Sequence, residues 1–300
     1  MSEVIGGRSG RGWRLPIAVC LVAAVFAAPA VAQDDEGQDE RQTGWFNEAE
    51  LSLVATDGNS QSETFSLRNT LRGVWADADL KITLGGLRAA STDVTRTAVG
   101  TSAADARLVE SSSTAVTAER YSFEARYDHR ISEGWYWYAS GGWVRNEPAG
   151  IKNRSSVAGG VGHRLLDTEA ARFRVDLAAT YTDQQDVVEA PGDGGGFLGL
   201  RLVSDYWRQL TATTEYANLS TLDQNLDDTT DLRAEMVNSL SVRISDSLAL
   251  RLSHELQYDN MPSLIAVPIF TPAGDAVAED LLIEADSVDT TLSIALVVGF

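Results

Sequence analysis

The 300-residue sequence contains only one cysteine and three histidines. The cysteine, Cys20, lies in an apolar N-terminal stretch, and Val19 precedes it where a lipoprotein signal would have a small residue. If this stretch is removed, no cysteine remains, which excludes a disulfide framework and thiol chemistry. Any metal site would then depend on histidine and carboxylate side chains.

Basic residues are also scarce, because 24 Lys and Arg stand against 43 Asp and Glu, for a formal net charge of −19. This balance argues against nucleic acid as a partner, since phosphates are bound by cationic surfaces. Beyond the N-terminal stretch, no segment approaches the ~20 consecutive apolar residues of a membrane helix. A membrane β-barrel would escape such a hydropathy test, because apolar and polar residues alternate along its strands.

Residues 1–32 are predicted to form a cleaved secretory signal peptide. Three arginines precede an apolar run, and the small residues 30–32 form the pattern that a signal peptidase recognises. We expect Sec-type export with cleavage between Ala32 and Gln33, followed by a flexible periplasmic lead-in over residues 33–44. The alternative, a retained transmembrane helix, is disfavoured because the run is short and contains proline.

From Trp45 to Phe300 apolar and polar residues alternate with a period of two, which is typical of strands with one apolar face. Most segments are longer than the usual soluble strand of about 5–6 residues and suit a tilted strand crossing a bilayer, which needs ~9–11. The twelve predicted strands cover residues 49–56, 63–75, 79–89, 120–128, 134–145, 154–166, 172–181, 196–205, 208–219, 232–244, 248–258 and 288–300.

Short and long connections alternate along this pattern, as they do between the two rims of an outer-membrane barrel. Short turns are predicted at residues 76–78, 131–133, 167–170, 205–207 and 245–247, and long loops at 90–119, 146–153, 182–195, 220–231 and 259–283; a tight hairpin at 57–60 is the exception. The predicted fold is therefore an all-β, transmembrane, antiparallel up-and-down β-barrel of about twelve strands over residues 45–300. Closure is required because hydrocarbon offers no partner to free backbone groups.

The apolar side of each strand is expected to face lipid and the charged side to face the lumen. The lumen-facing candidates are Arg68, Arg72, Arg120, Arg126, Arg174, Arg233, Arg251, Glu124, Glu235 and Glu255. With the predicted strand boundaries, more basic than acidic residues face inward, so the lumen is expected to be net positive. Two interpretations follow: an ion-pair lattice that braces a small barrel, or a narrow conduit that favours anions.

Aromatic residues near predicted strand ends are expected to form the two interfacial girdles of a membrane barrel. They are Trp75, Trp135, Trp137, Trp143, Trp207 and Tyr258. The alternative is that they are ordinary core aromatics. The terminal Phe300 ends an alternating strand, as in the C-terminal signal by which the barrel-assembly machinery recognises its substrates.

The three histidines, His129, His163 and His254, fall on the predicted outer side of three different strands. The outer membrane contains a twelve-stranded phospholipase whose catalytic strand carries His-x-Ser, but here isoleucine or leucine stands two positions after each histidine. A serine triad needs a base next to its nucleophile and an orienting group behind it. We therefore expect no catalytic, cofactor-binding or metal-binding residues. An outer-membrane hydrolase and a soluble periplasmic β-sandwich are the alternatives from other classes.

The predicted long loops are rich in acidic residues. Such loops could bridge divalent cations to lipopolysaccharide phosphates, although solvated loops are the simpler interpretation. The expected partners are outer-membrane lipid and lipopolysaccharide, the barrel-assembly machinery during insertion, and small anions if the lumen conducts. The expected location is the outer membrane of a Gram-negative cell.

Four stretches resemble a known bacterial family: residues 50–60 (ELSLVATDGNS), 120–122 (RYS), 131–138 (ISEGWYWY) and 159–165 (GGVGHRL). They are similar to the salt-induced outer membrane proteins, domain of unknown function 481, and the resemblance extends over roughly residues 45–300. It implies an outer-membrane barrel whose expression follows salt or osmotic stress, and it transfers no catalytic residues. The expected function is a non-enzymatic envelope barrel, structural or narrowly permeable, with a small-anion-selective channel as the alternative.

Overall fold

The computed structural model describes residues 43–56, 61–99, 107–188, 195–272 and 275–299. The predicted signal peptide, most of the lead-in and Phe300 lie outside these residues. Twelve strands form one closed antiparallel barrel, which confirms the predicted fold class. They are β1 (Gly44–Thr56), β2 (Gln61–Val74), β3 (Ala78–Val99), β4 (Arg107–Arg130), β5 (Trp135–Asn146), β6 (Ile151–Asp167), β7 (Ala171–Asp186), β8 (Gly195–Gln209), β9 (Thr214–Asn225), β10 (Leu232–Ser245), β11 (Leu248–Asp259) and β14 (Val288–Gly299).

Each barrel strand pairs with its neighbours in the sequence, and β14 closes the ring between β11 and β1. The closing seam is short: β1 pairs with β14 at four positions, from Glu48 opposite Gly299 to Leu51 opposite Leu296. Closure removes the free sheet edges that could not be tolerated in hydrocarbon.

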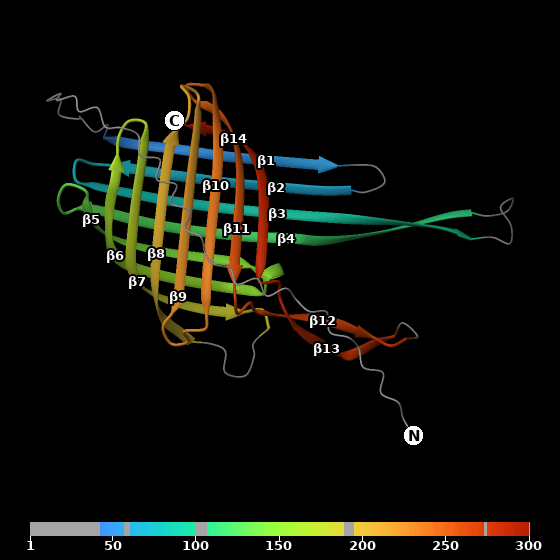
Figure 1. Ribbon diagram of the computed structural model, residues 1–300. Coiled ribbons are helices and arrows are strands. Elements are labelled where there is room, and N and C mark those ends of the chain that lie inside the picture. The colour runs from blue at the N-terminus through green and yellow to red at the C-terminus, as the bar shows by residue number, and fades with distance from the viewer. Residues whose placement is uncertain (1–42, 57–60, 100–106, 189–194, 273–274, 300) are drawn as a thin grey trace. The chain divides into compact units, whose positions relative to one another are not determined.

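Short and long connections lie at opposite ends of the barrel (Figure 1). The short-turn rim consists of residues 75–77, 131–134, 168–170, 210–213 and 246–247, which join β2 to β3, β4 to β5, β6 to β7, β8 to β9 and β10 to β11. The remaining connections form the long-loop rim. One predicted turn, at residues 205–207, was wrong, because β8 continues through Asp205 and Trp207 to Gln209. The true turn is capped by Thr211, whose hydroxyl accepts hydrogen bonds from the amides of Thr213 and Thr214.

Strand residues extend into all five predicted long loops, and two of these loops consist largely of regular strand. β3 and β4 stay paired far beyond their neighbours, as far as Val99 opposite Arg107, so most of the predicted loop at 90–119 is a β-ribbon. The predicted loop at 259–283 contains a hairpin of β12 (Leu264–Phe270) and β13 (Ala276–Glu284). The ribbon escaped prediction because its Ser, Thr and Ala residues lack an apolar phase, whereas strand pairing needs only the backbone.

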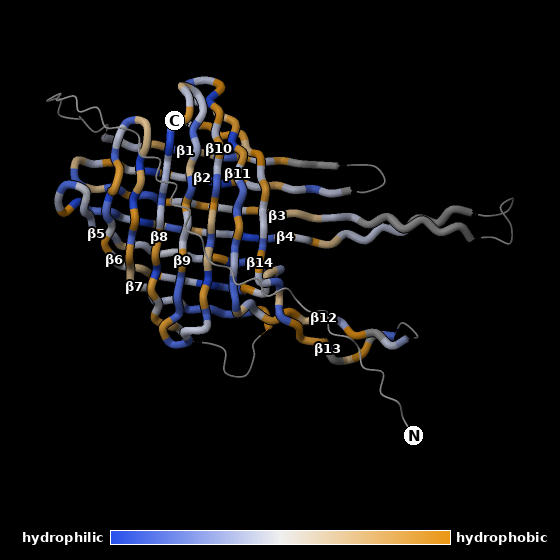
Figure 2. The backbone as a smooth tube through the Cα atoms, in the orientation of Figure 1, coloured by the Kyte–Doolittle hydropathy of each residue, from blue (hydrophilic) through white to orange (hydrophobic). Residues whose placement is uncertain are grey.

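Apolar and polar residues alternate along the barrel strands, as the changing colours in Figure 2 show. Side chains such as Leu67, Leu84, Leu177 and Leu252 are exposed on the outside, while the charged residues of the opposite phase point inward. This arrangement follows from the period of two, because successive side chains of a strand leave opposite faces. Among the described residues, no helix is long and apolar enough to cross a membrane.

Two glycines of β6 permit close packing inside the barrel. A Cβ at Gly162 would overlap the Tyr136 hydroxyl and the Asp176 carboxylate, which are among the most buried groups in the described chain. A Cβ at Gly160 would overlap the backbone of Leu177 and Ala178 on β7. The glycine-rich stretch of β6 is therefore explained by close approach of backbone and side chains.

We expect Gly160→Ala to lower the free energy of unfolding by about 1–3 kcal/mol, because neighbouring backbone must move to admit the methyl group. Urea titration of the refolded barrel, followed by its migration on gels without heating, measures this loss. Gly159→Ala is the matched control, since a Cβ at Gly159 meets no atom within 4 Å. Equal stability of the two variants would contradict this account of the packing.

Candidate functional site: the barrel lumen

The barrel lumen contains two cavities lined mainly by polar and charged side chains. The larger cavity, of about 550 Å³, is bounded chiefly by β4–β10, and the smaller one, of about 510 Å³, by β2–β4, β10, β11 and β14. Arg68, Arg120 and Arg251 border both cavities. Nine further residues line both cavities, so the two cavities adjoin inside the barrel.

The predicted lumen residues gather around these cavities. The larger cavity is lined by Arg68, Arg120, Arg126, Arg174, Arg233, Arg251, Glu124 and Glu235, and the smaller one by Glu255. Arg72 borders neither cavity and is half exposed, with its guanidinium 3.5 Å from Asp79. The alternation of the sequence thus brings nine of the ten candidates to the cavity walls.

The most buried part of the lattice joins β4, β5 and β7. Asp176 accepts a hydrogen bond from the Tyr136 hydroxyl, and its second oxygen lies 2.7 Å from Arg126 Nη1. The side chain of Asp176 is fully buried, and Tyr136 is 1% exposed. Neighbouring Arg174 contacts Asp205 at 2.8 Å and Asp128 at 3.4 Å. Each buried charge in this group therefore has an opposite charge in contact, as burial in a low-dielectric interior requires.

An ion pair between Arg120 on β4 and Glu255 on β11 crosses the lumen. These strands are five positions apart in the ring order β4–β3–β2–β1–β14–β11, where opposite walls of a twelve-strand ring are six apart. A direct contact over that separation means that side chains from nearly opposite walls meet. The bridge therefore spans the lumen between nearly opposite walls and narrows the lumen at that level.

Two further charged residues of strand β11 form ion pairs on its inward side. Arg251 contacts Glu48 at 2.8 Å and Glu50 at 2.5 Å on β1. At the other end of β11, Asp259 lies 3.2 Å from Arg233 and 3.6 Å from Arg154 on β6, which is again five strands away. Positions 251, 255 and 259 share one face because they differ by even numbers, so this strand links three parts of the barrel wall.

The interior charge differs from the predicted positive excess. The larger cavity is lined by nine basic and ten acidic residues. The acids of this lining that fell outside the predicted inward set are Glu48, Asp205, Asp223, Asp231 and Asp286. Glu48, Asp205 and Asp223 were missed because β1, β8 and β9 extend beyond the predicted strands, whereas Asp231 and Asp286 lie just before β10 and β14. The lining is therefore close to balanced.

The mouth at the long-loop rim is partly covered by ordered connections. A 3₁₀ turn, η1 (Glu147–Ala149), places Ala149 beside both cavities. Ser263, just before the β12–β13 hairpin, donates a hydrogen bond from its hydroxyl to Asp186 at 2.9 Å. These segments narrow access to the lumen from that side.

An acidic connection at the same rim is ordered by its own side chains. Asp228 accepts hydrogen bonds from the Thr230 hydroxyl at 2.6 Å and from its amide at 2.9 Å. These bonds, the hydroxyl's foremost, hold the pKa of Asp228 below its ordinary value. In the described residues, no group of three or more potential metal ligands is assembled. The divalent-cation role suggested for acidic loops thus stays a prediction.

The predicted girdle aromatics do not all lie on the outside. Trp75, Trp135 and Trp137 are exposed on the outer face near the short-turn rim. Trp143 pairs with Phe123, and Tyr258 pairs with Val288. The side chains of Phe123 and Val288 are exposed on the outer face, so Trp143 and Tyr258 belong to the same face. Trp207 is a correction: it belongs to the inward phase of β8, where the Arg172 guanidinium lies 4.2 Å from its ring and Glu215 accepts its indole N–H.

Two of the histidines belong to aromatic clusters rather than to a triad. The rings of His163 and Trp135 stack at 4.4 Å, and His129 lies 5.6 Å from Trp137. His163 Nδ1 is 3.2 Å from the carbonyl oxygen of Gly134. Over the part of the chain that the structure describes, no histidine forms a hydrogen bond with a serine or a carboxylate. The geometry gives no support to the hydrolase alternative.

Residues 49–265 match the family described as "Protein of unknown function, DUF481". The chain belongs to the DUF481 family. No curated protein matches this DUF481 sequence.

Several solved outer-membrane structures are similar to this DUF481 barrel at low identity. The COG4313 outer membrane channel from Pseudomonas putida F1 is 13% identical over 89% of this chain and 100% of its own, with a TM-score of 0.43. The anion-selective porin from Comamonas acidovorans is 9% identical over 86% and 99%, with a TM-score of 0.37. The translocator domain of the autotransporter NalP from Neisseria meningitidis is 11% identical over 87% and 90%, with a TM-score of 0.42.

We expect Asp176→Ala to destabilise the barrel by about 3–5 kcal/mol, because it leaves Arg126 buried without this partner. The double variant Asp176→Leu with Arg126→Met should recover most of that loss, since neither charge then remains. Urea unfolding midpoints of the refolded proteins provide the measurement. Removing the exposed Arg145–Glu147 pair should cost under about 1 kcal/mol. If removing the exposed Arg145–Glu147 pair lowered the free energy of unfolding as much as Asp176→Ala does, burial would not explain the loss at Asp176.

Proposed function

We propose that this DUF481 protein is a non-enzymatic β-barrel of the bacterial outer membrane, with a braced lumen that passes at most water and small ions. The Arg120–Glu255 bridge between nearly opposite walls carries this proposal, because it crosses the lumen and narrows the space through which a solute would pass. The expected link to salt or osmotic stress rests on the family resemblance and is tested by expression at raised osmolarity.

The outer face supports a membrane location. Leucine, valine and isoleucine side chains are exposed all around the wall, for example Leu53, Leu84, Leu177 and Ile294. Such a continuous apolar surface is unfavourable in water and suits acyl chains. A barrel closed by backbone pairing is also one of the two structures that hydrocarbon tolerates. Recovery from the outer-membrane fraction tests this location, and recovery as a soluble periplasmic monomer would exclude it.

The lining disfavours strong ion selectivity. Nine basic and ten acidic side chains border the larger cavity, and most basic groups are held in ion pairs. Selectivity for anions needs uncompensated positive charge along the pathway. The small-anion-selective channel therefore remains the second candidate, and a permeability ratio strongly favouring chloride over potassium would establish it.

In planar bilayers we expect the wild-type barrel to show little or no conductance. The double variant Arg120→Ala with Glu255→Ala should raise single-channel conductance severalfold, because it removes the side chains that cross the lumen together with one charge of each sign. The measurement is the size of the current step at fixed voltage and salt.

The exposed pair Arg145 and Glu147 provides the control, since its double alanine variant removes an ion pair that does not cross the lumen. Large wild-type steps would contradict a braced lumen. An unchanged conductance in the Arg120 and Glu255 variant, with the protein folded, would show that this bridge does not restrict passage.

A further inference from the structure

A row of polar side chains crosses the outer face of four neighbouring strands. Tyr206 on β8 pairs with Asn218 on β9, Asn218 with Asn238 on β10, and Asn238 with His254 on β11. Residues directly opposite in paired strands share a face. The row therefore lies on the same outer surface as Leu240 and Leu252, which are exposed.

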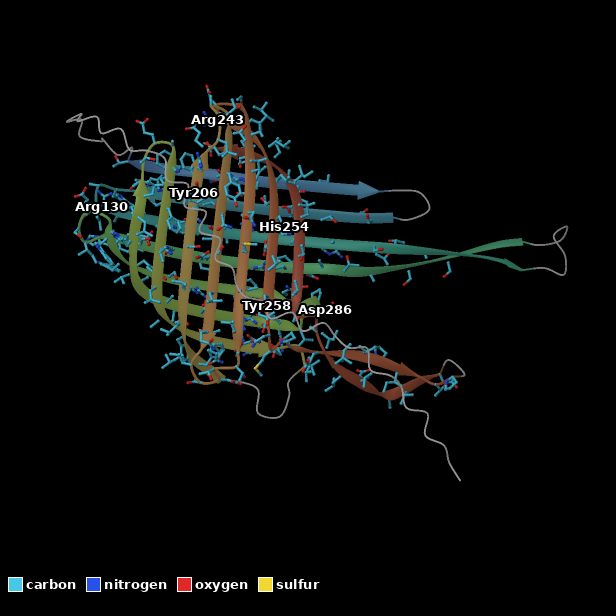
Figure 3. All side chains as sticks on the ribbon, in the orientation of Figure 1. Arg130, Tyr206, Arg243, His254, Tyr258 and Asp286 are labelled. Atoms are coloured by element: carbon cyan, nitrogen blue, oxygen red, sulfur yellow. The ribbon has the colours of Figure 1, made fainter. Side chains whose placement is uncertain are left out.

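The row lies near the middle of the wall. On β10, Asn238 is flanked in phase by Met236 and Leu240, and on β11 His254 is flanked by Leu252 and Leu256. Figure 3 shows His254 between Arg243, at the short-turn end, and Tyr258, at the long-loop end. In a barrel that spans the bilayer, these polar groups would lie within hydrocarbon.

The hydrogen bonds within the row use its amide oxygens but leave donors over. Asn238 Oδ1 accepts from the Tyr216 hydroxyl at 2.7 Å and from Asn218 Nδ2 at 2.9 Å, and Asn218 Oδ1 accepts from Ser220 at 3.1 Å. Within the described residues, Asn238 Nδ2 and the His254 ring have no hydrogen-bond partner. An unpartnered polar group in hydrocarbon costs several kcal/mol, so this part of the wall requires a partner.

Other polar groups on the outer face are accommodated within the wall. Asn69 Nδ2 donates to Asn47 Oδ1 at 2.7 Å, and His129 and His163 lie beside tryptophan rings near the short-turn rim. The row of Tyr206, Asn218, Asn238 and His254 differs because it extends over four neighbouring strands, and among the described residues no aromatic ring stacks on His254.

We infer that this row is the centre of an interface with a second copy of the chain inside the membrane, an inference that rests on the proposed membrane location. The row contains no Asp, Glu, Lys or Arg side chain and carries both spare donors, on Asn238, and acceptors, on the Tyr216 hydroxyl and a His254 nitrogen. A surface with both kinds of group is complementary to itself. A twofold axis along the membrane normal keeps each residue at the same depth in both copies, as an isologous dimer requires.

Lipid acyl chains offer neither donor nor acceptor, so they cannot satisfy these groups. Hydrogen bonds between membrane segments contribute modestly to association, and the exposed Leu240 and Leu252 beside the row add apolar contact. The polar row thus determines which part of the wall associates with the second copy, and the surrounding apolar side chains contribute contact area to the interface.

Disulfide crosslinking in native outer membranes tests the inference. In a Cys20→Ser background, Leu252→Cys places a thiol beside His254, and Leu84→Cys places one on β3, five strands from β10 in the ring. We expect mild oxidation to give a crosslinked species of twice the chain mass from Leu252→Cys and none from Leu84→Cys.

Adding Asn238→Leu should lower that crosslinking by about tenfold, because two symmetry-related hydrogen bonds are lost while the membrane-facing surface becomes more apolar. Asn69→Leu is the matched control: it breaks an in-wall amide pair on the same kind of surface and should leave crosslinking unchanged. Both variants should still migrate as folded barrels on unheated gels.

Equal crosslinking from both cysteine positions, a monomer in every sample, or a crosslinked product of another mass would overturn the second copy as the partner. A chain that is absent from the outer-membrane fraction would instead refute the proposed location. The failure of the interface and the failure of the proposed function are therefore distinguishable.

Discussion

Charge compensation inside a narrow closed sheet is the constraint on which the rest of this structure depends. Arginine is long and always charged, so an inward arginine must reach a carboxylate across a space too small for full hydration. The Arg126–Asp176 contact and the Arg120–Glu255 bridge meet this demand in different ways, one deep within a cluster and the other across the lumen. Because partners come from distant strands, the lattice ties the fold together beyond backbone pairing.

The same lattice limits what the barrel can conduct. A bridge between walls five strands apart narrows the lumen, and balanced charges give little preference between ions of opposite sign. Strand β11 has a central part in this arrangement, because Arg251, Glu255 and Asp259 contact β1, β4 and β6 from one inward face. A shift of β11 would therefore alter the lumen at three levels together.

Alternation in the sequence predicted the closed barrel, because a period of two depends only on strand geometry. It failed where that signal is absent. A turn was predicted at residues 205–207, but backbone pairing carries β8 through them, and Asp205 and Trp207 lie on its inward side. The ribbon of β3 and β4 has no apolar phase to detect. Partners such as Arg120 and Glu255, 135 residues apart, depend on the radius and stagger of the closed sheet.

Polar groups on both faces of β11 need a partner when they are removed from water, but one face meets the lumen and the other faces outward. Inward Glu255 finds its partner within the chain, because the lumen brings the opposite wall within reach. Outward His254 has no wall opposite it, and in hydrocarbon no water can replace the missing partner. A closed cylinder can therefore satisfy its interior alone, whereas a polar row on its exterior is satisfied only by association. Lumen bracing and lateral pairing are thus separable properties of adjacent residues on the same strand.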